Sequence, residues 1–330
     1  MNKIKGMTLC AITGLIAYCL GNFYPIIGGP VFAILIGMVL SNQVTTLDHV
    51  QVGIQFTSKK VLQFAVILLG FSMNVTQVIA SGRESLPVIV STITTSLIVA
   101  YCLTKALNLE PTLGTLIGVG SSICGGSAIA ATAPVIEADN EDIAKSISVI
   151  FLFNVIAALI FPTLGEWLGL TNQGFGLFAG SAINDTSSVT AAASSWDTIH
   201  SSHTLEIATV VKLTRTLAII PITMGLSIYH NHKKTIQTQK LKISQLLPPF
   251  IVLFIIASIT TSVISIPDQW IHGLKNISKF CITMAMAAIG FNTHFKKLLL
   301  TGGNAIIVGF SCWLSITLMS LFIQYLLGLI

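Results

Sequence analysis

The sequence predicts an all-α polytopic membrane protein with about 11 hydrophobic segments. Of its 330 residues, 53% are apolar and only 9% are charged, whereas a soluble domain carries about 25% charged residues. The mean hydropathy is +0.85. Apolar stretches of spanning length follow one another along the whole chain, and two of them contain small polar residues. These two segments are predicted to be interrupted helices, which either cross the membrane or re-enter it.

The hydrophobic segments approach the length of about 20 residues that a spanning helix needs. In chain order they are 7–23, 24–41, 59–79, 86–107, 112–136, 143–168, 174–195, 204–229, 246–266, 278–295 and 302–329. The longest polar connection runs from 230 to 242. No soluble domain fits between the segments, so residues 1–330 are predicted to form a single integral membrane domain, with its core motifs in 112–229.

The basic loops predict the orientation. Cytoplasmic loops carry an excess of Lys and Arg, and the basic stretches at 59–60, 230–242 and 295–297 all fall on the side of the N-terminus. We therefore expect a cytoplasmic N-terminus and a C-terminus on the opposite side. The basic start leads directly into further membrane segments, which argues against a cleaved signal peptide.

Two internal repeats are visible. Residues 59–109 match the residues 220 positions later, and residues 120–133 match those 60 positions later. Inverted repeats with interrupted segments at equivalent places are the usual construction of secondary transporters.

The repeats leave two topologies open for the segments at 112–136 and 174–195. If all segments cross, these two run in the same direction. If both are re-entrant hairpins that enter from opposite faces, nine segments cross and both repeats are inverted. Each segment is long enough to cross, so we favour full crossing with broken helices. The acidic loop 137–142 then lies outside, whereas the hairpin model places it inside.

Two similar motifs mark the centres of these segments, GSSICGGSA at 120–128 and GSAINDTSS at 180–188. Glycine tolerates unwound backbone, and serine hydroxyls bond freed backbone groups. The ends of broken helices bind ions through N–H or carbonyl groups. Close helix packing is the alternative for small residues, but Asn184 and Asp185 in the second motif favour a solute or ion site.

Asp185 has three interpretations. A charge at the centre of a spanning helix costs about 2.5–3.5 kcal/mol on insertion scales, so the side chain is expected to face protein. In the first interpretation Asp185 exchanges protons, and in the second it coordinates Na⁺ together with oxygens of Asn184 and Ser188. The structural alternative is a permanent ion pair with Lys212 or Arg215.

Lys212 and Arg215 lie three residues apart and share one face of a helix. The arginine fork suits an oxyanion with two coplanar oxygens, and lysine adds a point charge. Two cations near one carboxylate leave one positive charge uncompensated, which favours an anionic solute. The alternative places both at the membrane edge, where they snorkel to water.

The sequence contains no nucleophile elbow, zinc-protease motif or phosphate-binding loop, so we expect no enzymatic activity and no cofactor. The six cysteines have no metal or disulfide spacing, although Cys124 is placed to line a cavity. The net charge of +5 arises mainly from short loops and does not predict nucleic-acid binding.

In its three motifs, at 120–129, 182–190 and 208–216, the chain resembles the YeiH family of bacterial inner-membrane proteins. The family is labelled sulfate exporter and is grouped with the cation:proton antiporter and bile-acid transporter superfamily. The resemblance implies two inverted five-helix repeats, with a panel domain and a core domain of crossing broken helices. It also implies a location in the bacterial inner membrane, where the orientation predicted from the basic loops makes the C-terminus periplasmic. Many relatives of this architecture form dimers, so a homodimer is a further expectation.

The sequence therefore predicts a secondary transporter of a small oxyanion, with sulfate as the leading candidate, coupled to H⁺ or Na⁺. A cation:proton antiporter and a non-transporting membrane subunit are the alternatives. Asp185 and Asn184 are predicted to hold the coupling ion. The predicted substrate-binding residues are Ser121, Ser122, Gly125, Gly126, Ser127, Asn184, Ser187, Ser188, Lys212 and Arg215.

Overall fold

The computed structural model describes residues 2–23, 28–43, 50–231, 249–264, 266–293 and 303–329. Within these residues the regular structure is helical, as predicted. The first half contains α1 (Asn2–Phe23), α2 (Gly29–Gln43), α3 (Gln51–Phe56), the π-helical turn η2 (Thr57–Val61), α4 (Leu62–Gly70), α5 (Val75–Ala106), α6 (Pro111–Ser122), α7 (Gly126–Thr132) and α8 (Asn140–Trp167). The second half contains α9 (Asn172–Ala182), α10 (Thr186–His200), α11 (Thr204–Thr216), α12 (Ile219–Asn231), α14 (Pro249–Val263), α15 (Asp268–Asn292) and α17 (Gly303–Leu326).

Several described helices have the length and hydropathy of membrane spans. Six runs meet both criteria, namely Lys3–Gly21, Gln51–Gly70, Val75–Ala106, Asn140–Trp167, Thr204–Ile228 and Gly303–Leu326. The number of crossings therefore stays a prediction. The basic stretches at 232–242 and 295–297 lie outside the described residues.

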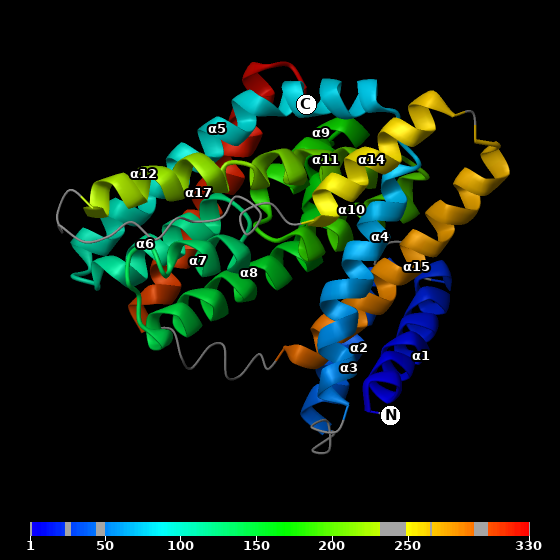
Figure 1. Ribbon diagram of the computed structural model, residues 1–330, viewed down its shortest axis with the longest axis horizontal. Coiled ribbons are helices and arrows are strands. Elements are labelled where there is room, and N and C mark those ends of the chain that lie inside the picture. Colours follow the sequence, from blue (N-terminus) through cyan, green and yellow to red (C-terminus); the bar gives the residue numbers. More distant parts are fainter. Residues whose placement is uncertain are drawn as a thin grey trace.

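The helices form two groups (Figure 1). The scaffold group consists of α1, α2, α3, η2, α4 and α15, which pack on one another at the right of the view, together with α14, which packs on α4. In this group a Cβ on Gly290 would lie 2.9 Å from the Cα of Gly37, so α2 and α15 approach closely because both residues lack side chains. The core group contains α5 to α12 and α17.

The segments at 111–132 and 172–200 are re-entrant hairpins, so the favoured crossing model is wrong. At the base of the first, Thr112 Oγ1 donates to Asp142 Oδ2 at 2.6 Å, which places the beginnings of α6 and α8 side by side. At the base of the second, Trp196 Nε1 donates to Asn172 Oδ1 at 2.8 Å, and Thr204 Oγ1 donates to the Asn172 carbonyl at 3.2 Å. Each segment thus enters and leaves on one face.

The two hairpins enter from opposite faces. The first has its base beside the beginning of α8, and the second follows the end of α8, a helix of 28 residues that is about 42 Å long. Near the middle of α8, Asn154 Oδ1 accepts a hydrogen bond from Asn184 N at the tip of the second hairpin. Length and hydropathy do not distinguish a hairpin from a crossing helix, because both need about 20 apolar residues.

The scaffold helices run in the directions that inverted repeats require. Gln51 Nε2 donates to Asn292 Oδ1 at 2.9 Å, so the beginning of α3 lies beside the end of α15. Ser278 Oγ donates to the Ala65 carbonyl nearer the middle of the two helices. The α3–α4 helix and α15 are therefore antiparallel, whereas the repeats themselves stay a prediction.

Candidate functional site

Both hairpin tips are breaks in helical backbone. α6 ends at Ser122, Ile123 leaves the helical region at φ −120° and ψ −88°, and α7 begins after Gly125. Gly125 has φ +67° and ψ −127°, a conformation that side-chain-bearing residues avoid. In the second hairpin, Ile183 is extended and Asp185 caps α10 by accepting from Ser188 N. The predicted interruptions therefore occur within the two predicted motifs.

Lys212 and Arg215 join the two tips. Lys212 Nζ donates to the carbonyls of Ile123 at 2.6 Å and Ile183 at 3.2 Å. Arg215 Nε donates to the Ser122 carbonyl at 2.8 Å, and an Nη atom donates to the Ile183 carbonyl at 3.1 Å. Both cations come from the face of α11 that meets the carbonyl ends of α6 and α9.

The second Nη of Arg215 completes the contact. It donates to the Ser121 carbonyl at 2.5 Å and to Asn184 Oδ1 at 3.3 Å. The carbonyls of Ser121, Ser122 and Ile123, at the end of α6, thus each receive a hydrogen bond from Arg215 or Lys212. A helix end that is buried without such partners would be strongly unfavourable. The negative end of each helix dipole also attracts the cations.

These contacts exclude two of the structural alternatives. Both cationic side chains are 0% exposed, so neither snorkels to the membrane edge. In the described core, no ion pair joins Asp185 to Lys212 or Arg215. Lys212 and Arg215 are instead satisfied by backbone carbonyls. Their role as direct anion ligands stays a prediction.

A cavity of about 590 Å³ lies against the beginnings of α7 and α10, the helices that follow the two breaks. It is located between the core and scaffold groups. Its polar lining comes from η2, α4, α7, α8, α10 and α11. The lining includes Ser58, Lys59, Gln63, Ser127, Asn154, Asp185, Thr186, Ser187 and Thr216. The cavity extends from the tips to the exposed Lys59, in the half of the molecule that holds the base of the first hairpin.

The structure divides the predicted site residues into two sets. Gly126, Ser127, Asp185 and Ser187 line the cavity, as does Cys124. The others pack behind the tips or in their backbone: Ser121, Ser122, Gly125, Asn184, Ser188, Lys212 and Arg215.

Asp185 is the acidic group of the cavity wall. One oxygen, Oδ2, accepts from Ser187 Oγ and from Ser188 N. Its other oxygen, Oδ1, is buried and has no hydrogen-bond partner. Asn184 Nδ2 is also buried and has no hydrogen-bond partner. Buried polar atoms normally have hydrogen-bond partners. Unpaired atoms at the second hairpin tip therefore indicate a place for an ion, a proton or water.

Sequence reasoning missed Lys59 as a lining residue. It treated Lys59 and Lys60 as an orientation signal, whereas η2 directs Lys59 to the cavity. Single π-helical turns occur frequently at functional sites. The basic pair was the only available signal, and it does not reveal which of the two lysines faces inward. Asn154, on α8, also lines the cavity, and its Oδ1 accepts a hydrogen bond from Asn184 N at the second tip.

Residues 5–309 match the family model described as Conserved hypothetical protein 698. A UPF0324 membrane protein of Streptococcus mutans is 56% identical over 99% of this chain and 98% of its own length. Another, of Fusobacterium nucleatum, is 54% identical over 99% of each chain. A solved sodium proton antiporter from Methanocaldococcus jannaschii covers 95% of this chain and all of its own, with 13% identity and a TM-score of 0.31. That last likeness is too remote to carry an argument about fold or function.

Proposed function

The chain belongs to the Conserved hypothetical protein 698 family of membrane proteins, and we propose that it is a secondary transporter of a small oxyanion, with sulfate as the first candidate. The observation that carries this proposal is the pair of buried cations beside a polar cavity that contains one carboxylate. The proposal assigns no chemical reaction to the site. Transport requires only that the cavity bind the solute and open alternately to the two faces.

The charges at the hairpin tips couple the binding of the anion to the binding of a coupling ion. Lys212 and Arg215 bring two positive charges, and the carbonyl ends of α6 and α9 each contribute roughly −0.5. An ionised Asp185 then brings the sum close to zero. When a proton or Na⁺ neutralises Asp185, about one positive charge remains at the hairpin tips. That charge favours an oxyanion in the cavity, so the two solutes bind more tightly together than alone.

The lining residues suit such an anion. The hydroxyls of Ser127, Thr186 and Ser187 are donors, and the N-terminal end of α10 adds a positive dipole end. Lys59 supplies a mobile cation at the outer part of the cavity. Lys212 and Arg215 contribute charge from behind the tips while their donors hold the backbone.

Radiolabelled sulfate flux into proteoliposomes, with and without a pH gradient, tests the proposal. We expect saturable, gradient-sensitive flux in the native chain and none in Asp185→Asn. Lys59→Gln should raise the KM for sulfate by about 10- to 100-fold, since a hydrogen bond to a charged group contributes roughly 1.5–3 kcal/mol. Lys60→Gln is the matched control, because Lys60 bonds Gln63 Oε1 at 3.4 Å and does not line the cavity. Absence of sulfate flux in the native chain contradicts the choice of solute.

A cation:proton antiporter is the second candidate, and the unpartnered Oδ1 of Asp185 favours it. A carboxylate oxygen without a hydrogen-bond partner is free to take up a proton, or to bind Na⁺ together with further oxygen ligands. This reading predicts pH-driven Na⁺ or K⁺ flux that needs no anion. Lys59→Gln would then leave the flux unchanged, whereas Asp185→Asn would abolish it.

The proposal also includes the orientation. The face with the base of the first hairpin holds the beginning of α1 and is near Lys59, Lys60 and Lys105. By the excess of positive charge this face is cytoplasmic, in a bacterial inner membrane. The acidic loop at 137–142 then lies inside, as the hairpin topology requires.

A further inference from the structure

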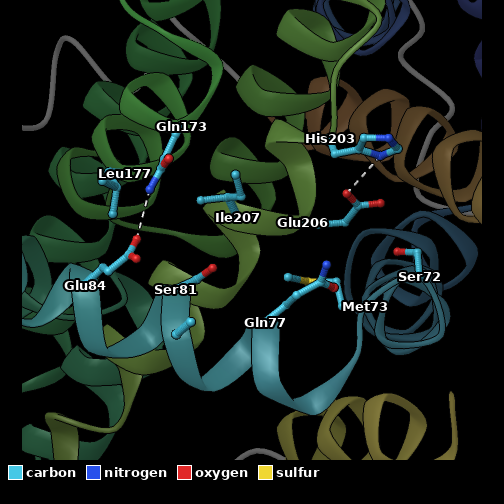
Figure 2. A pocket seen from close by; sticks show the side chains of 11 residues that line it. Ser72, Met73, Gln77, Ser81, Glu84, Gln173, Leu177, His203, Glu206 and Ile207 are labelled. Carbon is cyan, nitrogen blue, oxygen red and sulfur yellow. Dashed lines mark hydrogen bonds and ion pairs between the residues drawn. The ribbon is translucent and has the colours of Figure 1, made fainter. Parts of the chain in front are cut away.

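A second cavity, of about 420 Å³, lies on the opposite side of the tips, near the base of the second hairpin (Figure 2). Its polar lining consists of Ser72, Gln77, Ser81, Glu84, Gln173, His203 and Glu206. Gln173, in the first turn of α9, donates through Nε2 to Oε2 of Glu84 on α5 at 2.9 Å. No residue lines both this cavity and the one that contains Asp185.

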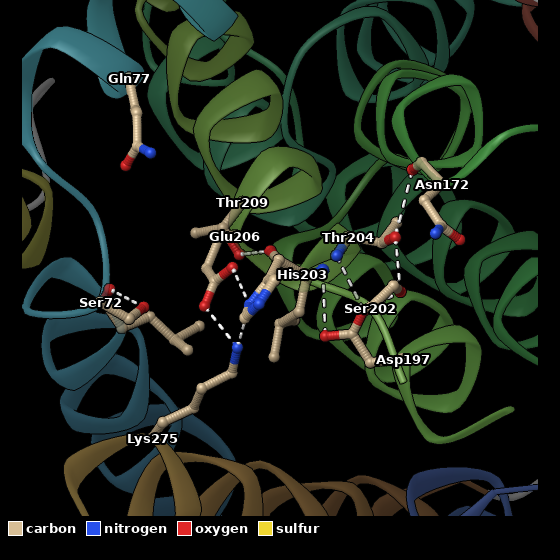
Figure 3. Close-up of polar contacts among 12 residues, drawn as sticks. Ser72, Gln77, Asn172, Asp197, Ser202, His203, Thr204, Glu206, Thr209 and Lys275 are labelled. Atoms are coloured by element: carbon tan, nitrogen blue, oxygen red, sulfur yellow. Dashed lines mark hydrogen bonds and ion pairs between the residues drawn. The ribbon is translucent and has the colours of Figure 1, made fainter. Parts of the chain in front are cut away.

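At this cavity lies a cluster of three titratable side chains (Figure 3). Lys275 Nζ is 2.8 Å from Glu206 Oε1 and 2.6 Å from His203 Nδ1. His203 Nδ1 is in turn 3.3 Å from Glu206 Oε2. Glu206 is 4% exposed and Lys275 is 9% exposed, so this ion pair is largely removed from solvent.

The turn before α11 holds the cluster in place. Asp197 Oδ1 accepts from Ser202 Oγ at 2.7 Å and from Thr204 N at 2.8 Å. The carboxylate thereby caps the beginning of α11, where a negative charge is stabilised. His203 lies within this capped turn, and Glu206 is in the first turn of the helix that follows.

The ion pair joins the two helix groups. Lys275 is on α15 of the scaffold group, and Glu206 is on α11, the helix that carries Lys212 and Arg215 between the hairpin tips. Among the ion pairs of the described residues, this one alone connects the groups. It lies on the face that the Asp185 cavity does not reach.

We propose that Glu206, Lys275 and His203 form the gate that closes this face in the present conformation. The inference rests on the proposed transport function. A solute in the Asp185 cavity reaches the opposite face only if α11 and the tips move relative to α15. Such a movement separates Lys275 from Glu206. Breaking a buried pair is strongly unfavourable unless new partners or water replace it, so the pair biases the protein toward the conformation seen here.

The test measures from which face the Asp185 cavity is reached. Ser127→Cys places a thiol in that cavity, at an exposed position. A membrane-impermeant charged maleimide is applied to vesicles of either orientation that contain the full chain. The same chain without Ser127→Cys reports the labelling of the native cysteines. We expect labelling only from the face with the base of the first hairpin.

Glu206→Gln combined with Lys275→Met removes both charges and leaves no buried charge unpaired. In this background, labelling from the opposite face should rise by about tenfold or more. The charge swap, Glu206→Lys with Lys275→Glu, should return it toward the native rate. Lys279→Met is the matched control, since it removes a cation one turn further along α15 that forms no ion pair within the described residues.

Two results would overturn the gate. One is equal labelling of the native chain from both faces, and the other is an unchanged rate in the neutral double variant that elutes as a folded protein. Labelling requires no substrate, so the gate and the proposed solute fail separately. Absence of sulfate flux together with the expected labelling would remove the oxyanion and leave the gate.

Discussion

Arg215→Met tests whether the buried guanidinium holds the hairpin tips together. Its removal leaves three buried acceptors without a donor: the carbonyls of Ser121 and Ser122 and the Oδ1 of Asn184. The Ile183 carbonyl keeps its bond from Lys212. An unsatisfied buried polar group costs about 1–3 kcal/mol. Arg215→Met is therefore expected to lower the free energy of unfolding by roughly 3–9 kcal/mol.

Lys212→Met provides the internal comparison. It leaves only the Ile123 carbonyl without a donor, so the expected loss is about 1–3 kcal/mol. Both substitutions remove one buried cation and so recover desolvation free energy of similar size. The difference between the two variants is consequently better defined than either loss, and it amounts to roughly 2–6 kcal/mol.

Thermal unfolding of the purified chain in detergent, followed by tryptophan fluorescence, measures this difference. At about 2 °C per kcal/mol for a large chain, Arg215→Met should melt at least roughly 4 °C below Lys212→Met. The exposed Arg83 provides a control, and Arg83→Met should melt with the native chain. Equal melting temperatures for the Arg215 and Lys212 variants would refute the reasoning, because the number of stranded acceptors would then not determine stability.

Three further experiments test the hairpins. Gly125→Ala forces an alanine into φ +67° and should cost about 1–3 kcal/mol of stability by thermal unfolding, while Gly126→Ala, whose Cβ would meet nothing within 4 Å, should be nearly neutral. A cysteine pair at Thr112 and Asp142 should form a cross-link under oxidation, seen as a mobility shift on a gel; no cross-link would contradict the shared base. Asn154→Leu leaves the backbone N–H at the second tip unpaired and should cost about 1–3 kcal/mol in the same melting assay, whereas an unchanged melting temperature would mean that the bond contributes nothing.

The sequence was sufficient for the class of protein and for the places where helices break. Hydropathy summed over about 20 residues depends little on neighbours, so it identifies membrane segments directly. Glycines and polar residues at 120–128 and 180–188 marked the two breaks because few other residues serve unwound backbone in a membrane. The cost of a buried charge also placed Asp185, Lys212 and Arg215 inside the protein.

The direction of the chain after each break was beyond the sequence. A hairpin and a crossing helix have the same composition, and the choice rests on contacts such as Thr112 with Asp142, 30 residues apart. The same limit affected Lys59, whose direction is determined by the π-helical turn η2.

The hydrogen-bond partners of the two cations were likewise determined by the tertiary structure. By itself the sequence determined that Lys212 and Arg215 share a helix face and must avoid lipid. An anion and a helix carbonyl end satisfy such a face equally well in terms of charge. Only the tertiary structure placed the carbonyls at the ends of α6 and α9 within 3.2 Å of both side chains. The fold thereby assigned them to the hairpin tips and left Asp185 beside the cavity.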